Sequence, residues 1–364
     1  LLSQVEVRRG LTYKPNDVRS KGARVLRSSN IVDDFFVISD DDVFVSKDVI
    51  NIPRVSNGDI LVTAANGSTK LVGKHAIIKN LPDDEIVVHG GFMLLFKTEQ
   101  NYFVNAWMSS NEYKRVLQFV QGGNGAIGNL SSAILKSMKM SVPSFSEQSA
   151  IGSLFSTLDD LLDSYKDNLT NYQSLKATML AKMFPKAGQI VPEIRLDGFE
   201  GEWKRKNLSE VCNINSGRDY KHLKDGDIPV YGTGGYMLSV NDKLSDEDAI
   251  GIGRKGTIDK PYLLSAPFWT VDTLFYVTCK VGYDLYYLFL IFQKVRWKKF
   301  DESTGVPSLS KKTIEKVVSK FPSLPEQQAI GAYFYNLDNL INSYQEKLSQ
   351  LETLKKKLLQ DMFI

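Results

Sequence analysis

One stretch of this sequence occurs twice, and this repeat constrains the fold more than any other feature. Residues 142–184 align with residues 321–363 without a gap, at a constant offset of 179, and 19 of the 43 aligned positions are identical. Both copies contain Glu-Gln followed closely by Ala-Ile-Gly, as in Ala150-Ile151-Gly152. A repeat of this length indicates that the chain holds two copies of one unit, each a variable block followed by a shared segment.

The shared segment has the apolar period of a coiled-coil helix. Apolar residues alternate spacings of four and three over five heptads, and in each copy a lysine, Lys176 or Lys355, interrupts the pattern at the equivalent place. We predict two long helices, 142–185 and 321–364, that form an antiparallel coiled coil and relate the two halves by a pseudo-twofold axis. The residues predicted for this coiled-coil or partner interface are Ile151, Phe155, Leu158, Leu162, Tyr165, Leu169, Ile330, Phe334, Leu337, Ile341, Tyr344 and Leu348. The alternative is that each helix packs only on its own neighbouring domain.

The variable blocks have mixed patterns of short strands and turns, which predict an α+β fold with two α/β domains. The first block covers residues 1–141, a lead-in follows the first helix at 186–207, and the second block covers 208–320. Strands are expected at 43–45, 59–62, 75–78, 92–96, 228–230, 249–252 and 273–277, and helices at 102–118 and 285–298.

Composition argues against several classes of protein. Hydrophobic residues make up 43% of the chain and charged residues 24%, which is typical of a globular protein. The two cysteines, Cys212 and Cys279, lie far apart, so we expect neither a disulfide framework nor a zinc site. This cysteine usage fits a protein of the reducing cytoplasm. The apolar run 285–292 is too short to span a membrane. The three histidines are scattered, and we predict neither a metal site nor catalytic residues.

Two short patterns resemble enzyme motifs but fit turns better. Residues 82–85 read Pro-Asp-Asp-Glu and lack the downstream acidic-x-lysine of a nuclease, so we interpret them as a solvated turn. Residues 251–256 read Gly-Ile-Gly-Arg-Lys-Gly, but a dinucleotide site needs a helix directly afterwards. The residues that follow predict a hairpin instead.

Polar and basic side chains gather on glycine-rich turns in both blocks. Singly, each such turn is more often an ordinary hairpin connection, but together they favour nucleic acid as a partner, because such turns can bring donors to base edges and phosphates. The net charge of +3 adds only weak support. The residues predicted to contact DNA are Asn66, Ser68, Thr69, Lys70, Lys74, Arg218, Tyr220, Lys221, Arg254, Lys255 and Lys260.

Several motifs together resemble a known family, over essentially the whole chain. They are the proline-rich start and Leu-Asp of the repeated helix, residues 58–61 leading to 66–68 and 71–74, residues 253–257 leading to 267–272, residues 304–309, and residues 198–203. The chain thereby resembles the specificity subunits of type I restriction-modification systems. The resemblance implies a non-catalytic scaffold, in which two target-recognition domains each read half of a split DNA sequence and the paired helices set the spacer.

The resemblance also implies partners and cofactors. Two modification subunits would bind alongside and methylate adenine with S-adenosylmethionine, and restriction subunits would use ATP and Mg, so no cofactor is expected in this chain. The chain differs from the expected repeat in one respect: residues 192–203 of the lead-in have no equivalent before the first block. We therefore expect further sequence ahead of Leu1. Two other hypotheses stay open: a fused methyltransferase or nuclease, and a coiled-coil protein organiser with peptide-binding domains.

Overall fold

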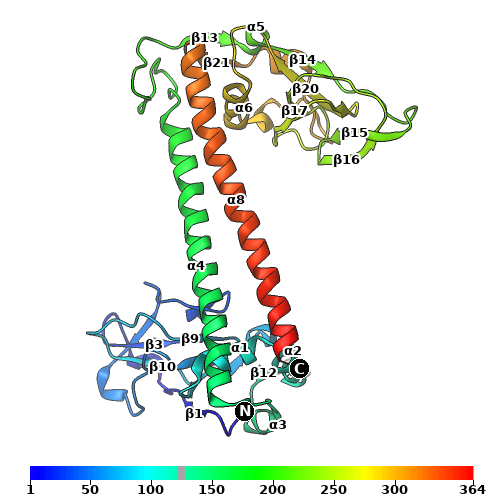
Figure 1. Ribbon diagram of the computed structural model, residues 1–364. Helices are drawn as coiled ribbons and strands as arrows, with labels where there is room; N and C mark the ends of the chain where they lie inside the picture. Colours follow the sequence, from blue (N-terminus) through cyan, green and yellow to red (C-terminus); the bar gives the residue numbers. More distant parts are fainter. Residues whose placement is uncertain (121–127, 364) are drawn as a thin grey trace. The chain divides into compact units, whose positions relative to one another are not determined.

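The computed structural model describes residues 1–120 and 128–363, which divide into two compact units. Unit 1 comprises Leu1–Lys166 and Glu346–Ile364, and unit 2 comprises Asp167–Gln345. Two long helices, α4 (Phe145–Lys182) and α8 (Leu324–Met362), each contribute one part to each unit (Figure 1). The two predicted long helices are therefore confirmed, with slightly shorter ends.

Unit 1 is built on two four-stranded sheets. The first has the order β1-β11-β7-β9 and is antiparallel throughout, and the second has the order β10-β3-β6-β2. Alternate residues of β7 face opposite ways: Ile60 and Val62 pack with α1 and α4, and Leu61 packs with the second sheet's Leu26. The strands and helices are β1 (Glu6–Arg9), β2 (Val18–Arg19), β3 (Ala23–Leu26), β4 (Ile31–Val32), β5 (Phe35–Phe36), β6 (Val43–Val45), β7 (Ile60–Thr63), β8 (Ala65–Asn66), β9 (His75–Ile77), β10 (Val87–His89), β11 (Met93–Lys97), β12 (Gly128–Asn129), α1 (Asn101–Ser109), α2 (Asn111–Leu117) and α3 (Ser132–Ser137).

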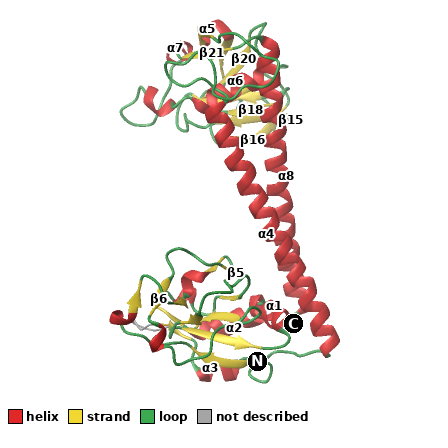
Figure 2. Ribbon diagram, turned by 90° about the vertical axis from the view of Figure 1, so that its left-hand side faces the viewer, coloured by secondary structure: helices red, strands yellow, loops and turns green. Residues whose placement is uncertain are grey.

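Unit 2 has a four-stranded antiparallel sheet of the same kind, with the order β14-β20-β17-β18. Its inner face packs on α6 and α8, as that of unit 1 packs on α1 and α4. The unit also has a three-stranded sheet β16-β15-β19 and the pair β13-β21. Figure 2 labels β15, β16 and β21 among these strands. The elements are β13 (Lys204–Asn207), β14 (Cys212–Ser216), β15 (Asp225–Gly232), β16 (Gly235–Val240), β17 (Ala249–Gly253), β18 (Tyr262–Leu264), β19 (Trp269–Thr270), β20 (Leu274–Cys279), β21 (Val318–Phe321), α5 (Leu208–Val211), α6 (Leu285–Lys294) and α7 (Lys311–Glu315).

Two predicted helices differ from the structure in their extent. The helix expected at 102–118 is broken at Ser110, because the Ser110 hydroxyl accepts a hydrogen bond from the backbone N–H of Tyr113 (3.5 Å) and caps a new helix, α2. The helix expected at 285–298 ends at Lys294 and is followed by a short 3-10 turn, Trp297–Phe300. Each predicted strand overlaps an observed one.

Repeated residues make the same contacts in each unit. The Gln148 side chain donates to the carbonyl of Pro143 (2.9 Å), and Gln327 donates to that of Pro322 (3.0 Å). A Cβ on Gly152 would lie 2.9 Å from the backbone nitrogen of Phe103 in α1, so only glycine lets the helices approach this closely. Gly331 is equally close to the start of α6, where a Cβ would lie 2.5 Å from Asp284 Oδ1. These contacts explain why the repeat keeps glutamine and glycine.

The stretches of α4 and α8 within each unit pack side by side and run antiparallel. In unit 1 the Phe155 and Phe363 rings are 5.9 Å apart, and Asp159 pairs with Lys355 (2.6 Å). As the number rises along α4, the number of its neighbour in α8 falls, which defines the direction. Of the predicted seam residues, Tyr165, Leu169 and Tyr344 are half-buried and the others are buried.

The lysines that interrupt the apolar seam have partners. Lys355 pairs with Asp159 within unit 1, and Lys176 pairs with Asp338 within unit 2, each with 2.6 Å between Nζ and Oδ1. The two pairs are equivalent under the offset of 179. A polar residue inside an apolar seam favours one register over others, because a shift would leave its charge without a partner.

No helix among the described residues is long and apolar enough to cross a membrane. Those residues also contain no group of three or more histidine, cysteine or acidic side chains that could hold a metal ion.

Candidate nucleic-acid interface

In unit 1 the structure brings all five predicted DNA-contacting residues to one connection, between β7 and β9. Asn66 lies in β8, and its side chain donates to the Ser28 hydroxyl (3.2 Å) and accepts from the backbone N–H of Ser68 (2.9 Å). Ser68, Thr69 and Lys70 are exposed on the following turn, whereas Lys74 is half-buried at its end. The connection thus presents hydroxyl, amide and ammonium groups from a turn held by Asn66.

A cleft of about 730 Å³ lies beside this connection. Asn66 and Gly67 form part of one side, and Tyr13, Arg27, Ser28 and Phe92 are among the other lining residues. Phe92 is 68% exposed, although large apolar side chains in a globular protein are usually covered. The Arg27 Nε atom is buried without a hydrogen-bond partner among the described residues. The exposed aromatic ring is suited to stacking on a base, and Arg27 adds a guanidinium group to the lining of the cleft.

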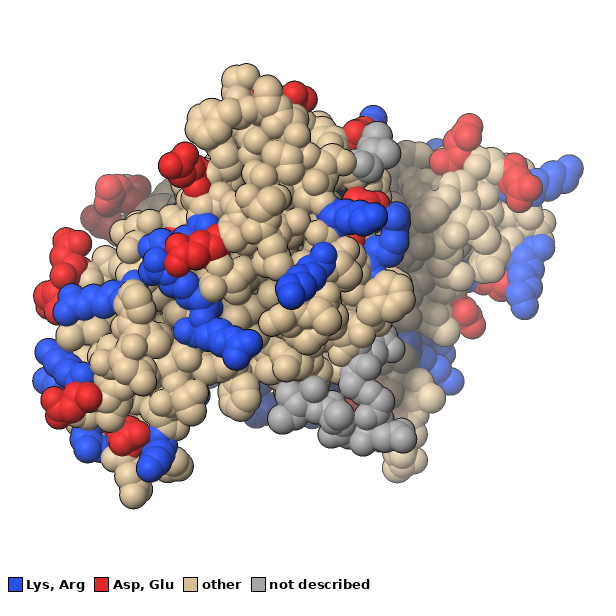
Figure 3. All heavy atoms as spheres, turned by 90° about the horizontal axis from the view of Figure 1, so that it is seen from below, with Lys and Arg blue, Asp and Glu red and all other residues tan. Residues whose placement is uncertain are grey.

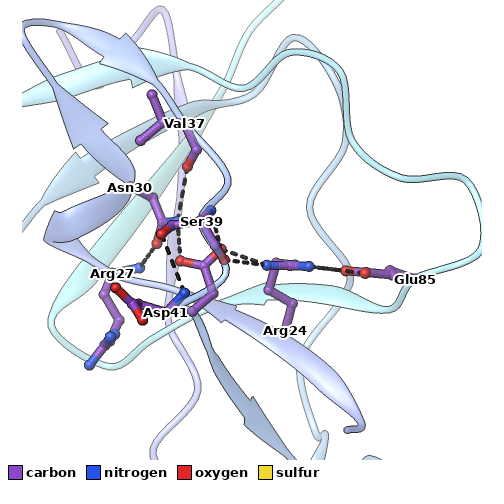
Figure 4. A network of polar contacts seen from close by, with 8 residues as sticks. Arg24, Arg27, Asn30, Val37, Ser39, Asp41 and Glu85 are labelled. Atoms are coloured by element: carbon purple, nitrogen blue, oxygen red, sulfur yellow. Dashed lines mark hydrogen bonds and ion pairs between the residues drawn. The ribbon is translucent and has the colours of Figure 1, made fainter. Parts of the chain in front are cut away.

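A buried polar network holds the turn that carries Arg27 and Ser28 (Figure 4). The Asn30 side chain accepts from the backbone N–H of Arg27 (2.7 Å) and donates to the Val37 carbonyl (3.0 Å) and to Asp42 Oδ1 (2.7 Å). Asp42 Oδ2 accepts from Arg24 Nη1 (2.7 Å). Because Asn30 is fully buried, this network fixes the turn at the edge of the cleft.

Glu85 closes the other end of the network. Its carboxylate accepts from Nε and Nη2 of Arg24 at 2.6 and 3.0 Å. These hydrogen bonds hold the pKa of Glu85 below its usual range. Residues 82–85 do form a turn, as expected, but the interpretation of the whole turn as solvated was wrong for Glu85, which is half-buried and paired.

In unit 2 the predicted residues lie in two places. Arg254, Lys255 and Lys260 are exposed in the connection between β17 and β18, which pair as an antiparallel hairpin. The expected hairpin is therefore confirmed, and no helix follows the glycines as a dinucleotide site would require. The Arg254 guanidinium lies 5.9 Å from the centre of the Phe275 ring and donates to the Asp272 carbonyl (3.4 Å).

Arg218, Tyr220 and Lys221 lie in the turn that follows β14. The carbonyl of Arg218 accepts from the Trp269 indole (2.9 Å), and its N–H donates to the Thr270 carbonyl (2.8 Å). Arg218 and Lys221 keep exposed side chains on this anchored backbone. Tyr220 is half-buried against the small cluster around Trp269, so most of its ring serves packing.

The hairpin of unit 2 also borders a cleft, of about 380 Å³. Arg254, Lys255 and Phe275 line it together with Ser216 and residues 308–311. The N–H of Leu309 donates to the Arg254 carbonyl (3.0 Å), as that of Leu130 donates to the Ala64 carbonyl in unit 1 (2.7 Å). Since Leu130 and Leu309 differ by 179, the two connections occupy equivalent places in their own units.

Sequence reasoning missed Tyr13, Arg27 and Phe92, which line the unit 1 cleft. A signal for Phe92 exists in the sequence, because an aromatic residue directly after Gly90-Gly91 sits on a turn. Nothing in the sequence indicates that Arg27 lies beside Asn66. In the view of Figure 3, lysines and arginines are interspersed with acidic residues rather than gathered in one patch, which fits the small net charge.

Each unit also exposes a pair of leucines, one from α4 and one from α8, at positions that are equivalent under the repeat. They are Leu161 and Leu354 in unit 1 and Leu340 and Leu175 in unit 2. Leu340 is the repeat equivalent of Leu161, and Leu354 that of Leu175. Apolar residues exposed at equivalent positions suit two copies of one partner protein.

Comparison with known proteins gives consistent matches. Residues 200–353 match the family described as type I restriction modification DNA specificity domain. The putative type I restriction enzyme MjaX specificity subunit of Methanocaldococcus jannaschii is 22% identical over 342 residues, which cover 84% of this chain and 77% of that protein. The type I restriction enzyme StySPI specificity subunit of Salmonella potsdam is 29% identical over 170 residues, 44% of this chain and 35% of that protein.

A solved structure has the same fold. The crystal structure of a type I restriction-modification system S subunit from M. genitalium superposes with a TM-score of 0.69 and 16% sequence identity, over 100% of this chain and 94% of that one. Together with the sheets and long helices described above, this match confirms the predicted fold class.

Proposed function

We propose that this chain is a type I restriction-modification specificity subunit and that each of its units reads one half of a split double-stranded DNA target. Within that family the chain is a DNA-recognition subunit and not an enzyme. The observation that carries the two-part target is the equivalent placement of the two connections, with Asn66 in one and Arg254 and Lys255 in the other. Two sites with different side chains in equivalent places suit two different half-sequences.

Different residues of the chain are suited to binding the DNA backbone and to recognising the bases. The exposed lysines are suited to phosphates, which orient a protein on DNA without reading sequence. The amide of Asn66 and the guanidinium groups of Arg27 and Arg254 are suited to base edges, where bidentate pairs discriminate between bases. The network around Asn30 keeps the unit 1 turn in one conformation before DNA binds, which lowers the entropy cost of binding.

We further propose that the paired helices scaffold two modification subunits, with restriction subunits joining the full complex in the cytoplasm. S-adenosylmethionine would bind to the modification subunits, and ATP with Mg to the restriction subunits. The exposed leucine pairs support this scaffold role, because each unit offers one pair. Replacing Leu161 and Leu354 by serine should remove one of two modification subunits, measured as the mass of the purified complex. The exposed Thr157 and Thr353, changed to alanine, are the matched control and should leave both subunits bound.

Methylation mapping tests the proposed function directly. The chain would be co-expressed with its modification subunit in a host without adenine methylation, and modified adenines located by single-molecule sequencing. The expected result is a two-part motif with one fixed spacer. A continuous motif would mean that only one unit reads DNA. An assembled complex without any methylation would favour the protein-organiser hypothesis.

A further inference from the structure

A groove of about 430 Å³ in unit 1 lies apart from the proposed DNA-contacting turns. Its walls include Phe103 and Trp107 of α1, Glu147 near the start of α4, and Met362 and Phe363 at the end of α8. Residues 139–143, which connect α3 to α4, form its edge. The groove therefore combines aromatic rings, a carboxylate and a stretch of extended chain.

In unit 2 the equivalent place is covered by residues 190–207 of the lead-in. Trp203 packs edge-on against the rings of Phe184 and Tyr287, both 6.0 Å away. Arg195 binds the Glu326 carboxylate through two hydrogen bonds of 2.8 and 2.7 Å. Strand β13, at the end of the lead-in, pairs with β21.

The offset of 179 matches these residues with those of the groove. Phe363 is the equivalent of Phe184, Glu147 that of Glu326, and residues 139–142 that of β21. The Phe103 and Phe363 rings are 5.8 Å apart, and those of Tyr287 and Phe184 are 5.4 Å apart. Both units thus contain the same aromatic base for a covering segment.

Exposure differs sharply between the equivalent residues. Met183 is 2% exposed and Met362 is 37% exposed, and Phe321 is 2% exposed and Val142 is 41% exposed. Glu326 is 1% exposed, whereas Glu147 is exposed and its carboxylate has no partner among the described residues. Residues 139–142 form no strand pairing in the described part of the chain. The groove therefore combines exposed apolar side chains with a carboxylate and a stretch of backbone that pairs with no strand among the described residues.

We propose that this groove is a docking site for an extended polypeptide segment with the chemistry of residues 190–207. Its arginine pairs with Glu147, its tryptophan packs on Phe103 and Phe363, and its last residues add a strand to 139–142. Strand addition supplies backbone hydrogen bonds, and the arginine and the tryptophan supply selectivity. This docking site lies apart from the proposed DNA-contacting turns and does not require that the chain binds DNA.

A labelled peptide with the sequence of residues 190–207, titrated with the full chain and followed by fluorescence anisotropy, tests the proposal. Saturable binding is expected, and Glu147→Gln should weaken it by about tenfold or more, because a charge-assisted bidentate pair is lost. Glu112→Gln is the matched control, since Glu112 lines the same groove but already pairs with Arg115 (3.0 Å). It should change the affinity little.

A double-mutant cycle identifies the pair. Replacing the peptide's arginine by alanine should weaken binding to the wild-type chain by a similar factor and should make Glu147→Gln nearly without further effect. Independent, additive losses would contradict the pairing. Equal binding of a scrambled peptide would overturn the docking site. So would the absence of binding by the free peptide at millimolar concentration together with no gain in Tm when the same segment is fused ahead of Leu1.

A fusion protein supplies the second measurement. The Leu1 nitrogen donates to the Met138 carbonyl (3.0 Å), as the Leu208 nitrogen donates to the equivalent Val317 carbonyl (2.9 Å). Placing a copy of residues 190–207 directly ahead of Leu1 therefore delivers it to the groove at high effective concentration. The fusion should raise the Tm by at least about 2 °C. Glu147→Gln should lower the Tm of the fusion but not that of the original chain, and a scrambled fusion with the same gain would refute specific docking.

Discussion

Arg254 carries its charge on an exposed turn, but its neighbours hold it in place. The guanidinium lies over the Phe275 ring and donates to the Asp272 carbonyl, so it has few conformations to lose on binding. If it reads a base edge, Arg254→Ala should relax the choice of base at one half-site, because a bidentate contact is worth about 1–3 kcal/mol of discrimination. Methylation mapping of the variant measures this change.

The sequences at which the Arg254→Ala variant loses methylation distinguish a base contact of Arg254 from a phosphate contact. A phosphate contact would weaken methylation at all sequences alike and would reduce the salt dependence of binding. Lys347→Ala, an exposed lysine on α8, is the control and should keep both half-sites unchanged. A changed preference in the half-site read by unit 1 would contradict the assignment of Arg254 to unit 2's target.

Asp42 is the buried centre of the network behind the unit 1 turn. Asp42→Ala removes one acceptor each from Arg24 and Asn30 and leaves both groups buried, so we expect a loss of about 3 kcal/mol in the free energy of unfolding of unit 1. Denaturant unfolding measures it. Asp41→Ala, at the exposed neighbouring position, should cost less than about 0.5 kcal/mol. Equal losses for the two variants would show that the network is not stabilising.

The sequence indicates which polar and basic residues lie on turns, but it does not indicate which residues surround them in the fold. Asn66 and Arg254 stand beside glycines, and Lys70 lies three residues from one; the structure puts all three on connections between strands, with Lys70 and Arg254 exposed and Asn66 half-buried. Arg27 and Phe92 meet Asn66 only through tertiary folding, because 39 positions separate Arg27 from Asn66 (66 minus 27). A single sequence contains no local signal for such a contact.

The ion pairs between α4 and α8 fix the register of these helices. Lys355→Asp should place two carboxylates together in unit 1 and lower its stability by about 1 kcal/mol, since the pair is about one-fifth exposed. Combining it with Asp159→Lys should restore most of the loss, because the pair is rebuilt in reverse. Thermal unfolding of the single and double variants measures the coupling. Lys356→Asp, exposed one position along, should show no rescue by Asp159→Lys.

Helices whose apolar pattern repeats over many residues could be predicted from the sequence. Features that depend on a single side chain could not. The apolar spacing over five heptads fixed the seam, and the buried Phe155, Phe334 and Ile341 confirm it. The lysine in each copy could be seen as an interruption, but its aspartate partner lies on the other helix and could not be identified. The break between α1 and α2 depends on a single cap at Ser110, which an apolar pattern does not reveal.

For the whole molecule, the proposed role of the helices is to set the length of DNA left unread between the half-sites. Deleting one heptad from each helix, residues 166–172 and 345–351, preserves the apolar period and removes repeat-equivalent segments. Seven helical residues span about 10.5 Å. That length equals about three base pairs at 3.4 Å each. We expect the same two half-sites with a spacer about three base pairs shorter, as read by methylation mapping.

Deleting the heptad from α4 alone is the control that distinguishes an effect of helix length from disruption of the helix pairing. The seam of α4 would then be out of register with that of α8, and Lys176 would lose its alignment with Asp338, so the methylation complex should fail to form. The double deletion keeps both seams matched and should restore activity on the shortened site. An unchanged spacer in an active double variant would mean that the helices do not measure the DNA, even though each unit still reads its half-site.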